Sequence, residues 1–175
     1  MDRSQPPFLR GRVEDAELMP SVWVRGLEEV REMADRWAGD LGADAFWWVP
    51  GPALNPIGGL LRHIAGASLR LLHYAVGEPV PEELRERASQ ELQAEPGLEP
   101  AEVLSQFHRE MAQVQERIRG LGEADLGVVR EVGKKRIPAE AAFILNHLVE
   151  HAQHHAGQII VLRKLWDATR GGGQA

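Results

Sequence analysis

The sequence predicts an all-α protein, a four-helix bundle in which one connection is long. Three observations support this. Four stretches of about 20 residues or more carry apolar side chains at helical spacing. No stretch alternates convincingly as a sheet, and a long segment rich in proline and glutamate, residues 77–99, separates the second helical stretch from the third. Such a segment is typical of a bundle with a crossover connection.

The first two helices have clear boundary signals. The first is predicted for residues 21–41, after Pro20. The second is predicted to begin at Asn55-Pro56, an N-cap residue followed by proline at the first helical position, and to end at Gly77. Glycine is the usual residue just past the end of a helix, so Gly77 is a natural terminator.

The other two helices complete the bundle. The third is predicted for residues 100–121, with apolar residues at helical spacing, and the fourth begins at Pro138 and runs to about Trp166. Between them, the stretch GVVREV, residues 127–132, is predicted to be a short extended piece or hairpin.

The length of 175 residues favours one domain over residues 1–175, with the bundle at about 21–166, a flexible N-terminus and a glycine-rich C-terminal tail. The composition is globular, with 43% hydrophobic and 26% charged residues. The formal net charge of -6 argues against a nucleic-acid-binding surface, which would be basic. The short basic run at residues 134–136 is interpreted as a solvated turn.

The chain has no cysteine, which excludes a disulfide framework, a zinc ribbon and a protein thiol nucleophile. The first residues, MDRSQPPFLRGR, lack the apolar core of a signal peptide. No window approaches the run of roughly 20 apolar residues that spans a membrane. The sequence therefore predicts a soluble, cytoplasmic protein that partners neither membranes nor nucleic acids.

Histidines are concentrated in the fourth helix. The segment NHLVEHAQHHAGQI, residues 146–159, holds four of the seven histidines. At about 100° per residue, two of them fall on the apolar stripe of the helix, which predicts that they occupy core positions. That stripe comprises Ile144, Leu148, His151, His155, Ile159 and Leu162. His147 and His154 lie about 40–60° outside it.

The second helix carries a matching histidine. His63 shares one face with four other side chains, Leu60, Ala67, Leu71 and Tyr74. A buried imidazole without a partner costs about 1–3 kcal/mol, so three imidazoles on inner faces need a common explanation. A divalent metal held by His63, His151 and His155 supplies one, because imidazole suits zinc, nickel and ferrous iron.

Three protein ligands would leave a fourth position open, as in catalytic zinc sites. Zinc is the favoured metal, with nickel or iron as alternatives. The competing interpretations are core histidines that bond to neighbours, a solvated surface cluster, and a haem held between two helices.

Four further residues are candidates for proton transfer or for support of the ligands. They are His147, Glu150, His154 and Gln158. Glu150 has the alternative of an exposed helix charge. The stretch FWWVPGP, residues 46–52, precedes the second helix, and one of its tryptophans is a candidate for a pocket mouth or a dimer contact. The alternative is that both belong to the core at the end of the bundle.

The stretches NPIGGLLRHIAGAS and HLVEHAQHHAGQIIVLRKL resemble the DinB-like superfamily of metal-binding four-helix bundles. The resemblance is specific at the second-helix histidine and at the pattern HxxxHxGQ, here His151, His155, Gly157 and Gln158. It implies an up-down-down-up bundle with one metal near one end, held by His63, His151 and His155. Better-understood members use mycothiol or bacillithiol, as thiol transferases or as a maleylpyruvate isomerase.

The function expected from the resemblance is a metal-dependent thiol S-transferase of the bacillithiol or mycothiol type. Its partners would be a low-molecular-weight thiol cosubstrate and a small electrophile. The alternatives are a metal-dependent hydrolase, a metal-binding stress-response protein without turnover, and a structural dimer that binds no metal. The stress-response protein would have a closed coordination sphere and no adjacent cavity. We also expect a homodimer.

Overall fold

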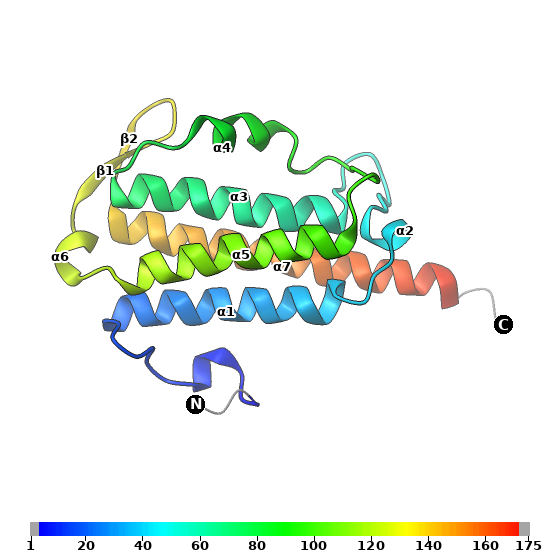
Figure 1. Ribbon diagram of the computed structural model, residues 1–175, viewed down its shortest axis with the longest axis horizontal. Coiled ribbons are helices and arrows are strands. Elements are labelled where there is room, and N and C mark those ends of the chain that lie inside the picture. Colours follow the sequence, from blue (N-terminus) through cyan, green and yellow to red (C-terminus); the bar gives the residue numbers. More distant parts are fainter. Residues whose placement is uncertain (1–3, 172–175) are drawn as a thin grey trace.

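Four long helices form the bundle in the computed structural model, which describes residues 4–171 (Figure 1). They are α1 (Leu18–Ala38), α3 (Ile57–Val76), α5 (Pro100–Arg119) and α7 (Ala141–Gly171). Helices α1 and α7 run in one direction and α3 and α5 run in the other, as Figure 1 shows. The predicted all-α, up-down-down-up bundle with a long connection between its second and third long helices is confirmed.

Short elements connect these helices. The connections contain α2 (Ala43–Phe46), α4 (Glu82–Glu86), η2 (Arg87–Ser89) and α6 (Glu123–Leu126), and η1 (Pro7–Leu9) precedes α1. Strands β1 (Val129–Val132) and β2 (Ile137–Glu140) pair antiparallel as a small hairpin. The predicted extended piece at 127–132 is therefore the first strand of this hairpin.

The bundle is closed by four helix pairs. Helix α7 packs against both α3 and α1, and α5 packs against the same two helices from the other side. Apolar side chains from all four helices fill the space between them, and the largest fully buried ones include Trp23, Leu61, Phe107, Met111 and Leu148. The antiparallel pair α3–α7 is the one that carries the histidines.

Three predicted helix starts are wrong. Helix α1 begins at Leu18, so Pro20 lies in its first turn and not before it, and the helix ends at Ala38 and not at residue 41. Helix α3 begins at Ile57 with Pro56 as its N-cap in an extended conformation (φ −70°, ψ 157°), so Asn55 is not the cap. Helix α7 begins at Ala141, because Pro138 lies in β2, where it faces Glu131 of β1. Proline at residue 138 fits a two-stranded hairpin, because each strand has a pairing partner on one side only. A backbone nitrogen on the open side makes no hydrogen bond in the ladder, so the N–H that proline lacks is not needed.

The predicted end of α3 at Gly77 is confirmed. Gly77 adopts a left-handed conformation (φ +76°), which favours glycine. The backbone N–H of Gly77 donates to Tyr74 O at 3.1 Å and that of Glu78 donates to His73 O at 2.9 Å. This pair of bonds is a Schellman motif, and it turns the chain into the crossover toward α5.

The segment before α1 contacts that helix at several points. The guanidinium of Arg25 donates to Gly11 O at 2.9 Å, the backbone N–H of Val13 donates to Ser21 Oγ at 3.1 Å, and Arg10 pairs with Glu32 at 2.6 Å. The outermost parts of the predicted flexible ends, residues 1–3 and 172–175, lie outside the described residues.

The crossover between α3 and α5, residues 77–99, lies along the outside of these two helices (Figure 1). It is held at two points, because Arg70 donates to Leu84 O at 3.0 Å and Trp47 Nε1 donates to Leu98 O at 2.9 Å. Trp47 is buried in the core, and Trp48 packs edge-on against Trp166. Across residues 4–171, no helix is long and apolar enough to cross a membrane.

Candidate metal centre

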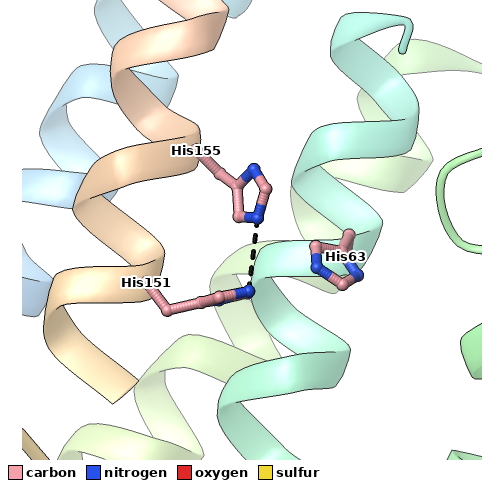
Figure 2. Close-up of side chains that lie close together, drawn as sticks. All are labelled: His63, His151 and His155. Carbon is pink, nitrogen blue, oxygen red and sulfur yellow. Dashed lines mark hydrogen bonds between the residues drawn. The ribbon is translucent and has the colours of Figure 1, made fainter. Parts of the chain in front are cut away.

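Three imidazoles from two helices meet between α3 and α7. His63 of α3 points toward His151 and His155, which lie one turn apart on α7 (Figure 2). One nitrogen from each ring can be chosen so that all three atoms lie within 4.8 Å of one another. The sequence prediction placed these three residues on facing inner surfaces, and the structure brings them together.

The spacing of these nitrogens fits a single metal ion. The Nε2 atoms of His151 and His155 are 3.2 Å apart. Two ligands on a tetrahedral ion with bonds of 2.0–2.1 Å would be separated by about 3.3 Å. The pair on α7 therefore already has the separation that zinc requires, and His63 closes the third side of the cluster.

The two α7 histidines are half-buried, which corrects the prediction that they occupy core positions. The apolar members of the same stripe, such as Ile144, Leu148 and Ile159, are buried, as predicted. Partial burial suits a binding site, because the ligands are partly desolvated and a small molecule can still reach them.

The environment keeps His151 and His155 neutral. Burial lowers the pKa of His151 to about 4, and the neighbouring His155 and His63 act in the same direction. Burial also lowers the pKa of His155, although its hydrogen bond to Gln158 opposes the change. Neutral imidazole is the form that binds metals, so both side chains are ready ligands at neutral pH.

Hydrogen bonds at the opposite ring nitrogens orient two of the ligands. His155 Nδ1 lies 2.9 Å from Gln158 Oε1, and His63 Nδ1 lies 3.2 Å from Glu91 Oε2. Because both acceptors are oxygen atoms, each Nδ1 carries a proton and each Nε2 keeps its lone pair. Among the described residues, His151 Nδ1 is buried and has no partner.

Sequence reasoning missed Glu91, which lies in the crossover and is only 1% exposed. Its carboxylate accepts two hydrogen bonds from Arg70, at 2.6 and 2.8 Å, and one from Arg87 at 3.2 Å. Burial alone would raise the pKa of Glu91, but the hydrogen bonds from Arg70 and His63 and the charges of Arg70 and Arg87 lower it to about 2.

An apolar groove adjoins the histidines, with a volume of about 400 Å³. It lies between α7 and the residues around the start of α3, and the described residues that line it include no Asp, Glu, Lys or Arg. Gln158 lines the groove and also bonds to His155, so the groove lies next to the cluster, although His63, His151 and His155 themselves do not line it. The apolar part of its wall is formed by Leu54, Leu60, Val161, Leu162 and Leu165.

The other candidate residues divide into two groups. His147 and His154 are exposed, and their rings lie 5.9 Å from His151 and 5.6 Å from His155. His154 also lines the groove. Glu150 is exposed, bonds to Asn146 and lines a different cavity between α1 and α7, so the structure does not bring it to the imidazoles.

Two histidines lie away from the cluster. His108 Nε2 is 2.7 Å from an oxygen of Asp35, and His73 Nδ1 is 3.6 Å from an oxygen of Glu78. The tryptophans predicted as candidates for a pocket mouth do not line the groove. For Trp47 the alternative interpretation, a core residue at the end of the bundle, matches the structure.

Comparison with known proteins gives one family and several similar folds. The family model of the DinB superfamily matches residues 26–159. No protein of curated function matches the chain significantly.

Among solved structures, a conserved protein from Enterococcus faecalis has a TM-score of 0.65 and 17% identity, with 86% of this chain and 98% of that one covered. A mycothiol-dependent maleylpyruvate isomerase has a TM-score of 0.59 and 16% identity, with 81% of this chain and 61% of that one covered. A histidine-to-alanine mutant of a mycothiol-dependent maleylpyruvate isomerase has a TM-score of 0.60 and 16% identity, with the same coverage. At these identities, the likeness concerns the fold alone.

Proposed function

Because the chain belongs to the DinB superfamily, we propose that it is a metal-dependent enzyme that transfers a low-molecular-weight thiol to a small electrophile. The observation that carries this proposal is the convergence of His63, His151 and His155 beside an apolar groove. A similar fold in a mycothiol-dependent isomerase supports the thiol class, although this chain spans only about three fifths of that protein.

His63, His151 and His155 would hold the metal through one ring nitrogen each. Three imidazoles without a thiolate suit zinc, and also nickel or ferrous iron. When bound, a divalent cation favours the deprotonated form of a thiol, which is the nucleophilic form. Gln158 and Glu91 hold the imidazoles with the lone pair of Nε2 available, so the chain presents preoriented donors.

The nucleophile must come from the cosubstrate, because the chain has no cysteine. In the proposed reaction, the sulfur forms a bond to the electrophilic carbon and the leaving group departs with the electron pair of its own bond. The thiol proton passes to solvent by way of His154 or His147, which are exposed and adjacent to the ligands. Imidazole is the usual proton carrier near neutral pH.

The groove would hold the organic part of the electrophile. Its volume of about 400 Å³ is within the range of small-molecule sites, and its lining is mostly apolar. A metal-binding protein without turnover would need no such groove beside its ligands. A metal-dependent hydrolase is the second candidate, since three protein ligands leave a position that water can take. The homodimer, the cytoplasmic location and the absence of nucleic-acid binding remain predictions.

The test of the metal site is elemental analysis of the purified, untagged protein by plasma mass spectrometry. We expect about one equivalent of zinc, nickel or iron in the parent. The double variant His151→Ala/His155→Ala should lose it, because two of three ligands are gone. His108→Ala is the matched control, since it removes a histidine outside the cluster, and it should keep the metal.

Stoichiometric metal in the double variant would contradict the site. If the site holds, the metal-loaded protein is assayed with mycothiol and with bacillithiol against a set of uncharged electrophiles. Thioether formation that requires both metal and thiol would support the transferase. Release of a hydrolysis product at the same rate without thiol would favour the hydrolase instead.

A further inference from the structure

We propose that Glu91 is a positioning residue for the metal ligand His63, and that the crossover docks on α3 in order to deliver it. The inference rests on the proposed metal site. It adds a part of the chain, the segment around residues 87–92, that the histidine pattern does not include. In a metal site, a carboxylate behind a histidine fixes the ring orientation and raises its basicity as a donor.

The first observation is how firmly the carboxylate is held. Arg70 donates to both oxygens of Glu91, at 2.6 Å to Oε1 and 2.8 Å to Oε2, and Arg87 donates to Oε1 at 3.2 Å. Arg87 is itself held by Glu110 of α5, at 2.7 and 2.8 Å. The carboxylate therefore has a fixed orientation, with Oε2 directed to His63 Nδ1 at 3.2 Å.

The second observation is that α3 makes room for this carboxylate. Gly66 lies three residues after His63, so it is on the same side of the helix. A Cβ atom at Gly66 would lie 1.8 Å from Glu91 Oε1, which no side chain could tolerate without displacing the carboxylate. A Cβ at Gly59, two turns earlier, would lie 2.8 Å from the backbone oxygen of Leu92. Residues 91–92 therefore pack closely against α3 at these two glycines, which have no side chain to keep them away.

The burial of Glu91 needs an explanation that packing alone does not give. A carboxylate that is 1% exposed carries a large desolvation cost, which an apolar side chain at this position would avoid. Here the charge is balanced by two arginines, and Oε2, which accepts from Arg70, also lies within hydrogen-bond distance of the His63 imidazole. The arrangement leaves the lone pair of His63 Nε2 free for a metal and holds the ring still.

Gly66→Ala separates positioning from folding. Alanine is the better helix former, and the atom it would strike is the end of a flexible side chain, so the helix can keep its place while Glu91 moves. Gly127→Ala is the control. Gly127 follows α6, lines neither the cluster nor the groove, has φ −82°, and a Cβ there would meet nothing within 4 Å. Glu91→Gln is the second variant, which keeps an acceptor but removes the charge.

The measurement is the affinity of each purified protein for Zn²⁺, by competition with a chromophoric chelator at neutral pH. Loss of a partner behind a metal ligand weakens binding by about 10–100-fold. We expect losses in that range for Gly66→Ala and Glu91→Gln, and affinity within about twofold of the parent for Gly127→Ala.

A spectroscopic readout distinguishes positioning from a general loss of structure. The visible bands of the Co²⁺-loaded protein report the ligand field directly, and they should shift or weaken in Gly66→Ala while the far-ultraviolet circular dichroism stays that of the parent. If Glu91→Gln does not fold, because two arginines lose their partner, Gly66→Ala decides the question alone.

Folded Gly66→Ala protein with the Zn²⁺ affinity and Co²⁺ bands of the parent would overturn the role of Glu91. In that case the metal site stands and only the positioning role fails. A parent protein that binds no Zn²⁺ would overturn the proposed function together with this inference, so the two failures are distinguishable.

Discussion

His151 combines three properties that suit a metal ligand. It is half-buried, its Nε2 faces that of His155 at 3.2 Å, and burial lowers its pKa to about 4. The folded protein therefore resists protonation of a side chain that titrates near pH 6.5 in the unfolded chain. Between pH 6.5 and 4 the unfolded state binds more protons, so the stability of the metal-free protein falls as the pH is lowered through this range.

We expect the metal-free protein to lose about 1–2 kcal/mol of unfolding free energy from His151 between pH 7 and pH 5. The check is urea unfolding at both pH values for the parent and for His151→Asn, which should lose less. The pKa of Glu91 is lowered to about 2, so its carboxylate stabilises the folded protein above about pH 4.5 and this stabilisation is lost mainly below that pH. The loss therefore does not interfere between pH 7 and pH 5. Equal losses in both proteins would contradict the prediction.

The sequence indicates the three ligands because they lie on regular helices, where spacing fixes direction. The arithmetic of the helix brings His151 and His155 to one side, and the apolar neighbours of His63 show which side of α3 faces inward. Glu91 cannot be found in this way. It is one of many glutamates in an irregular segment. Its role depends on Arg70 and Gly66, which are distant in the sequence, and on Arg87, which is close in the sequence but lies in the same irregular segment.

Helix α7 carries two functions along its length. His151 and His155 are followed, within about three turns, by Gln158, Val161 and Leu165, which line the groove. Two of the three proposed ligands and part of the groove wall are therefore on one rigid element, and the relative position of these parts does not depend on a loop. This arrangement favours precise placement of a substrate against the metal.

A charge placed in the groove should impair the binding of an uncharged electrophile. Val161→Asp puts a carboxylate into the wall, where an apolar ligand would have to desolvate it. We expect the affinity for 1-chloro-2,4-dinitrobenzene, followed by saturation-transfer NMR, to fall about tenfold, which corresponds to about 1.4 kcal/mol.

Phe143→Asp is the control for the groove variant. It introduces the same charge on α7 at another exposed apolar residue, which does not line the groove. Its affinity should stay near that of the parent, and both variants should keep the metal. Parallel losses in the two variants, or none in either, would exclude the groove as the binding site.

The elements themselves were predictable where local signals dominate. The long helices α1, α3 and α5 and the end at Gly77 follow from periodicity and terminating residues. The start of α7 did not follow, because the pairing of β2 with β1 is a contact between segments and overrides the local signal of Pro138. Likewise, the choice of Pro56 as the cap of α3 depends on how the preceding turn enters the bundle.

At the scale of the whole molecule, the cluster of His63, His151 and His155 joins the second long helix to the last. An ion bound by His63, His151 and His155 would bind the folded state and not the unfolded chain, where the ligands are far apart. Free Zn²⁺ at 100 times its dissociation constant would then stabilise the fold by about 2.7 kcal/mol. For a chain of this size, that corresponds to a rise in Tm of about 5–10 °C.

Differential scanning calorimetry with and without Zn²⁺ checks this stabilisation. A chelator should reverse the rise in Tm, and His63→Ala should show little or none. An equal rise in the parent and in His63→Ala would mean that the ion binds elsewhere on the surface.

The up-down-down-up topology has a kinetic consequence. His63 and His151 are separated by about ninety positions, so closing the loop between them is entropically expensive. The cluster is therefore expected to assemble late, after α3 and α7 have docked, and an interaction that forms after the folding barrier leaves the folding rate nearly unchanged. Its full effect falls on the rate of unfolding. A bound ion would therefore slow unfolding and lengthen the lifetime of the native bundle, without making folding faster.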